Sequence, residues 1–222
     1  SSGDTGSNSR VDLYVRIIQE LAVKHQMPQF KLGYFYSEVD KAWLKQQMAR
    51  GETVQGLDGF ADLSEAELDA TERVVAMAGV HPFVELLRQG ADVIIGGRSS
   101  DAALFAAPAL FHGFQADHAY YLGKVLECAS FCAEPYGGKE TVTGEITQDA
   151  VLVTAMSPQQ RCTVASVAGH AMYERSNPFE EFFAGGKLDM THCNYEQVSE
   201  KTTRITGSRF IASAKIAMRS AW

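Results

Sequence analysis

The hydrophobic positions in the first hundred residues switch between a helical and an extended spacing. Apolar side chains recur every three or four residues from Val11 to Ala22, the period of an amphipathic helix, which Pro28 would end. The run Phe30–Tyr36 is short and aromatic, which is typical of a strand. Cap residues and stop signals predict further helices that begin near Glu38, Ser64 and Pro82 and end at Gly51, Gly79 and Gly90.

A continuous apolar run at residues 91–95 carries the strongest strand signal. Ala91 to Ile95 is the pattern of a strand buried on both faces of a parallel sheet. Helices are predicted to follow from Ala102 towards Leu110 and from Asp117 to Ala133. This alternation predicts an α/β domain over residues 1–138, with a mostly parallel sheet and helices on both of its faces.

The pattern changes after residue 138. Two short, β-branched, alternating segments, Thr141–Thr147 and Ala150–Thr154, predict a hairpin, and Thr163–Tyr173 again has the helical period. Residues 139–222 are therefore predicted to form a smaller α+β portion.

A glycine loop opens the chain without the strand that normally precedes such a loop. Ser1 leads directly into Gly3-Asp4-Thr5-Gly6 and then into the first helix. We therefore expect that a first strand precedes Ser1 in the natural protein. A sheet that lacks this strand exposes unpaired backbone groups at an edge, so we expect this chain to be a homo-oligomer.

Charge and composition exclude several classes of partner. The net charge is −7 and basic residues are scattered singly, so no nucleic-acid partner is expected. No apolar stretch reaches the roughly 18–20 residues of a membrane span, and no secretory signal is visible. Four cysteines without zinc spacing indicate buried free thiols. We therefore predict a cytoplasmic protein with no membrane partner.

The predicted ligand site lies where the strand at residues 91–95 ends. Two glycines let the backbone approach a ligand, and the following helix presents unpaired N–H groups. Arg98 adds a forked cation that suits a carboxylate or phosphate. The opening loop likewise places glycines directly before a helix. We therefore expect both loops to bind one small anion at strand carboxyl ends. The predicted ligand-binding residues are Gly3, Asp4, Thr5, Gly6, Asn8, Gly96, Gly97, Arg98, Ser99 and Ser100.

Candidate acids and bases lie further along the chain. Asp101, Glu127 and His170 are the residues predicted to transfer a proton. Lys124 shares a helical face with Glu127, a pair that also has a purely structural interpretation. His170 and Glu174 are four residues apart and could together bind a divalent metal, although no second histidine completes the usual motif. No cofactor is indicated.

Several long runs resemble one known family. The runs are Gly90–Asp101, Gly123–Cys128, Arg161–Glu174, Gly185–Asp189 and Val198 through Gly207–Phe210. In order and spacing they resemble the N-terminal domain of the acyclic terpene utilisation family. The resemblance implies a metabolic setting, the breakdown of citronellol-like isoprenoids through branched acyl-coenzyme A thioesters. The resemblance assigns no role to any residue. Because family members are longer at both ends, it implies that this chain is a fragment.

Three functions stay open at this point. The first is a metabolic enzyme, or enzyme subunit, that binds a small carboxylate or acyl-coenzyme A anion. The second is a non-catalytic ligand-binding or subunit domain that uses the same loops. The third is a metal-dependent hydrolase or lyase that uses His170 and Glu174.

Overall fold

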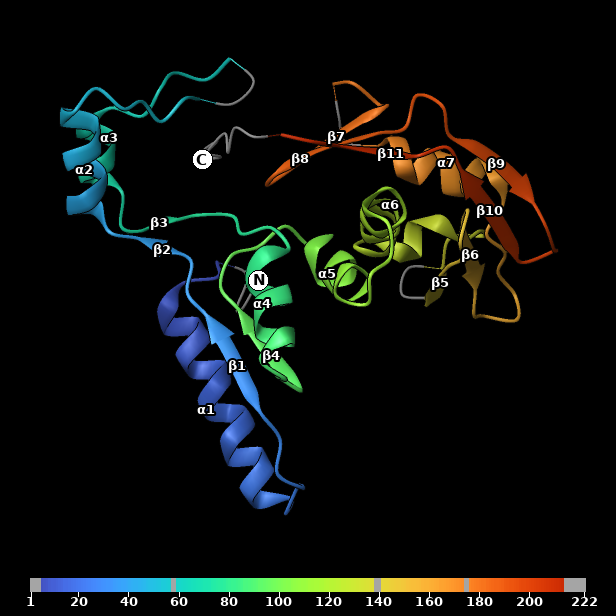
Figure 1. Ribbon diagram of the computed structural model, residues 1–222, viewed down its shortest axis with the longest axis horizontal. Helices are drawn as coiled ribbons and strands as arrows, with labels where there is room; N and C mark the ends of the chain where they lie inside the picture. Colours follow the sequence, from blue (N-terminus) through green and yellow to red (C-terminus); the bar gives the residue numbers. More distant parts are fainter. Residues whose placement is uncertain (1–4, 57–58, 138–140, 174–175, 214–222) are drawn as a thin grey trace. The chain divides into compact units, whose positions relative to one another are not determined.

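The computed structural model describes residues 5–56, 59–137, 141–173 and 176–213. The chain divides into two compact units, with the boundary between Ser100 and Asp101. The helices and strands of both units are labelled in Figure 1. The boundary predicted at residue 138 falls inside the second unit.

The first unit is built on two parallel strands with a helix on each face. Strands β1 and β4 pair in register from Leu32 opposite Val93 to Phe35 opposite Gly96. Phe35 packs edge-on against Phe83 of α4, with ring centroids 5.0 Å apart. The next residue, Tyr36, donates a hydrogen bond of 2.5 Å to Asp12 of α1. Successive side chains of a strand point to opposite faces, so α4 and α1 cover different faces of the pair. The elements of this unit are α1 (Asn8–Lys24), β1 (Leu32–Phe35), β2 (Glu38–Val39), α2 (Lys41–Ala49), α3 (Glu65–Ala70), β3 (Val74–Val75), α4 (His81–Arg88) and β4 (Val93–Gly96).

The prediction of a mostly parallel sheet is wrong. Among the described residues, β1–β4 is the one parallel sheet and it has two strands. The segments between β1 and α4 form a separate antiparallel pair, β2 with β3, instead of a continuous crossover helix. They pack around their own small core of Leu44, Leu63 and Leu68. Residues 64–79 have the helical spacing only as far as Ala70, where the chain becomes extended to pair with β2.

The second unit is built around helix α6, with antiparallel sheets packed on it. Strands β5, β6, β10 and β9 form one sheet in that order, and β11, β8 and β7 form another. Figure 1 shows α6 inside this unit, next to α5, β5 and β11. The elements are α5 (Ala103–Phe111), α6 (Ala116–Leu126), η1 (Ala129–Cys132), β5 (Val142–Ile146), β6 (Val151–Ala155), α7 (Val164–Met172), β7 (Glu180–Phe183), β8 (Gly186–Asp189), β9 (Asn194–Gln197), β10 (Thr202–Thr206) and β11 (Arg209–Ala212).

Helix α6 is buried along most of its length, which is unusual for a helix that carries a lysine. The side chains from Tyr121 to Val125 are all buried. A glycine is required at position 123, because a Cβ there would lie 2.5 Å from the carbonyl oxygen of Ala102. On another face, Tyr120 stacks on Phe210 with ring centroids 3.9 Å apart. Neighbours on several faces leave little water around α6, so a charged group on it needs a charged partner.

Candidate functional site

The opening loop and the loop after β4 meet in the first unit. Gly6 has φ +67°, and a Cβ on it would lie 2.3 Å from the backbone nitrogen of Arg98. Gly97 is equally confined, because its Cβ would lie 2.5 Å from Oγ of Ser37. The prediction that the two glycine loops are neighbours is confirmed for Gly6, whereas Gly3 and Asp4 lie outside the described residues.

Many polar groups at this junction form hydrogen bonds with other groups of the same chain. The carbonyl oxygen of Arg98 accepts hydrogen bonds from Ser37 Oγ at 2.9 Å and from the backbone nitrogen of Ala78 at 3.0 Å. The first amide of α1, on Asn8, donates to a carboxylate oxygen of Glu38 at 2.8 Å. This helix end therefore binds a carboxylate from the same chain, as its partial positive charge favours.

The remaining loop residues support this junction through their backbones. Ser99 is buried and forms an isolated parallel bridge with Ala78, whose carbonyl accepts a 2.9 Å hydrogen bond from the amide of Ser100. Thr5 is exposed, and its hydroxyl oxygen lies 3.4 Å from the amide of Ser7. The ligand-binding role of both loops stays a prediction.

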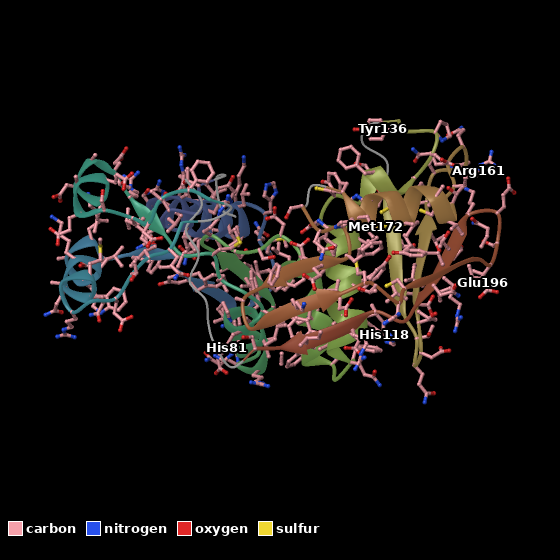
Figure 2. The ribbon with its side chains drawn as sticks, turned by 90° about the horizontal axis from the view of Figure 1, so that it is seen from above. His81, His118, Tyr136, Arg161, Met172 and Glu196 are labelled. Atoms are coloured by element: carbon pink, nitrogen blue, oxygen red, sulfur yellow. The ribbon has the colours of Figure 1, made fainter. Side chains whose placement is uncertain are left out.

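A charged cluster surrounds Lys124 in the second unit. The Lys124 side chain is 6% exposed and extends from the buried helix α6. Its ammonium group pairs with Glu127 Oε1 and lies 3.6 Å from Glu181 Oε2. It also lies 5.3 Å from the centre of the Tyr173 ring, a cation–π arrangement. In Figure 2, the label on Met172 marks the end of α7, from which the chain continues to Tyr173.

Glu127 holds its proton more tightly than an ordinary glutamate. Burial raises the pKa of this carboxyl, and the negative charges of Glu181 and Asp101 raise it further. The neighbouring Lys124 acts in the opposite direction, but burial is the largest cause. A carboxyl with a raised pKa can both give and take a proton nearer neutral pH, as an acid–base catalyst must.

An open pocket of about 390 Å³ has Glu127 among its lining residues. Its wall is formed by Phe105, Leu126, Glu127, Cys128, Ala129, Ser130, Thr141 and Val142. The lining is therefore mixed: aliphatic and aromatic groups surround a few polar ones, as in many small-molecule sites. Glu127 is the ionisable carboxyl of this wall.

The structure places the three predicted catalytic residues in different environments. Asp101 is exposed and acts on Glu127 through its charge. His170 is buried on α7, and its Nε2 lies 3.1 Å from the carbonyl oxygen of Val125. A carbonyl oxygen only accepts, so Nε2 carries the hydrogen and connects α7 to the end of α6. The catalytic roles of Asp101, Glu127 and His170 remain predictions.

Metal chemistry receives no support from the described residues, and two of the thiols are poorly suited to nucleophilic attack. Glu174, the partner proposed for His170 as a metal ligand, lies outside them. Across the part of the chain that the structure describes, no group of three or more His, Cys, Asp or Glu side chains could hold a metal ion. Burial raises the pKa of the Cys162 thiol to about 11 and of the Cys193 thiol to about 12, so both are weak nucleophiles at neutral pH.

Sequence reasoning missed Glu181 and the contact of Tyr173 with Lys124. Glu181 comes from β7, far along the chain from α6, so no local spacing connects it with Lys124. Residues 180–183 read Glu-Glu-Phe-Phe, without polar–apolar alternation, so the sequence does not show which of the two glutamates lies on the inner face of the strand.

A comparison with known protein families identifies the family of this chain. Residues 8–217, most of the chain, match the family described as acyclic terpene utilisation family protein AtuA. The chain belongs to this family. The predicted resemblance is thus confirmed, and membership implies a role in acyclic terpene utilisation. No curated protein and no solved structure matches the chain. Within the described part of this family member, no helix has the length and apolar character needed to cross a membrane.

Proposed function

We propose that this chain is an enzyme, or the catalytic part of one, that performs acid–base chemistry on a small acyl substrate in acyclic terpene breakdown. The observation that carries the proposal is Glu127, whose carboxyl has a raised pKa and which is one of the residues lining a pocket of mixed polarity. Phe105, Leu126 and Val142 offer the apolar surface that an aliphatic chain would cover. Family membership supports the metabolic setting.

Proton exchange tests this proposal directly. The 222-residue chain is incubated in D₂O with short branched acyl-coenzyme A thioesters and with the matching free acids, and each compound is analysed by mass spectrometry. We expect deuterium uptake or conversion for at least one compound class, because Glu127 would exchange a proton with the substrate. Binding of these compounds, measured by thermal shift, with neither exchange nor conversion would instead favour a non-catalytic ligand-binding domain.

The junction of the glycine loops supports an anion site as the second candidate function. Gly6 touches the backbone of Arg98, and the adjacent helix end already binds the carboxylate of Glu38. A carboxylate or phosphate of the ligand would be bound by the Arg98 guanidinium, whose forked N–H donors can contact two oxygens of either group.

Arg98→Ala is expected to weaken binding of such an anion without unfolding the chain. A charge-assisted hydrogen bond contributes about 1.5–3 kcal/mol, which corresponds to roughly a 10- to 150-fold increase in Kd. Calorimetric titration with acyl-coenzyme A thioesters measures the change. Arg88→Ala is the matched control, because Arg88 is an exposed arginine at the end of α4 and pairs only weakly with Glu85 at 4.0 Å. A large loss of stability with unchanged affinity would instead identify Arg98 as a structural ion-pair partner.

A further inference from the structure

Lys124 lies between two carboxylates that come from different elements. Glu127 is the residue at the C-terminal end of α6, one turn after Lys124, and Glu181 extends from β7. The side chains are 16% and 24% exposed, respectively, so water screens neither interaction fully. The ammonium group therefore divides its attraction between the two acids.

Strand β7 fixes which of its acids reaches Lys124. Glu181 is the cross-strand partner of Leu188, which is fully buried, so both belong to the inner face of their sheet. Glu180 belongs to the opposite face, where it pairs with Lys187. Two adjacent glutamates of one strand thus have different partners, and only Glu181 interacts with Lys124.

We propose that Glu181 is a positioning residue that shares the Lys124 ammonium with Glu127 and so controls how strongly Lys124 stabilises the Glu127 carboxylate. This inference rests on the proposed function, because it assigns Glu127 as the group that transfers the proton. Glu181 itself touches no reacting atom in this mechanism and acts through Lys124.

The charges on the neighbouring elements shift the pKa of Glu127 in opposite directions. Lys124 of α6 favours its ionised form, whereas Glu181 of β7 and Asp101 before α5 oppose it. From the α7 side, Tyr173 contributes a ring face to Lys124, and His170 donates to the carbonyl of Val125. Removal of the Glu181 charge should therefore strengthen the ion pair between Lys124 and Glu127 and lower the pKa of Glu127.

Carbon-detected NMR titration of the Glu127 carboxyl group in the full chain tests the inference. Glu181→Gln should lower the pKa of Glu127 by about one unit, and Lys124→Met should raise it by about 1–3 units, the range for a nearby charge. Glu180→Gln is the matched control: it removes a carboxylate one residue away that pairs on the other face, and should leave the pKa unchanged. Glu181→Asp keeps the charge and should recover part of the shift.

The outcomes separate this inference from the proposed function. If Glu181→Gln leaves the Glu127 pKa unchanged, or if Glu180→Gln moves it equally, the positioning role is wrong. If Glu181→Gln does not fold, the nitrogen chemical shift of the Lys124 ammonium is followed against pH in the wild-type chain instead. A change in two steps, one for each carboxylate, supports the inference, and a change in a single step overturns it. A shifted pKa in a chain that converts no substrate would uphold the coupling and contradict the proposed function alone.

Discussion

Glu127→Gln is expected to lower turnover about 10²- to 10⁴-fold, the usual contribution of a general acid or base. Glutamine keeps the shape of the side chain but can neither take nor release the proton. The fold should persist, because Lys124 retains Glu181 as an anionic partner. Circular dichroism checks the fold, and the deuterium-exchange assay measures the rate.

The pH profile gives this prediction a second readout. Because the pKa of Glu127 is raised, the limb that it controls in kcat/KM should lie above the pH at which an ordinary glutamate titrates. A base would gain activity as the pH rises through that value, and an acid would lose it. Glu127→Gln should abolish this limb. Full activity of the variant, with the limb retained, would move the acid–base role to another residue such as Asp101 or His170.

The same shift has a consequence for stability. Since the folded-state pKa of Glu127 is above its unfolded value, the protonated carboxyl favours the folded state. This contribution is fully present below the unfolded pKa and is lost as the pH rises through the folded pKa. The Glu127→Gln variant should therefore lose less stability than the wild type over that pH interval.

Gly6→Ala is expected to destabilise the first unit by about 2–5 kcal/mol, because a positive φ costs about 1–2 kcal/mol for an L-residue and overpacking adds about 1–3 kcal/mol. The added methyl would meet the backbone of Gly97 and Arg98, which cannot move aside as a flexible side chain can. Urea denaturation followed by circular dichroism measures the free energy of unfolding. Binding of the proposed anion should weaken as well, since the two loops would separate.

Gly51→Ala is the matched control for this clash. Gly51 also has a positive φ, +93°, but a Cβ there would meet nothing within 4 Å. Its substitution should therefore cost only the conformational term, about 1–2 kcal/mol. Equal losses at Gly6 and Gly51 would show that the opening loop does not contact the loop after β4.

Local patterns were enough to identify several elements and the family. The helical period predicted α1, the apolar run at residues 91–95 predicted β4, and the Ser64 capping box is present. These features depend on neighbours within a few residues, so the sequence contains them directly. The order and spacing of longer runs likewise indicated the family, which the match over residues 8–217 confirms.

Strand pairing and the environment of Lys124 depended on contacts between distant residues. The apolar strand at residues 91–95 does pair in parallel with β1, but no local pattern shows how many strands join this pair, so a mostly parallel sheet was predicted wrongly. The spacing of Lys124 and Glu127 was equally compatible with an ion pair exposed on the surface, which would contribute little to the stability of the fold. Only the tertiary fold buries α6, brings Glu181 across from β7 and raises the pKa of Glu127. Desolvation and charge act through space, and therefore the folded chain, more than any motif, decides which carboxyl can carry the chemistry.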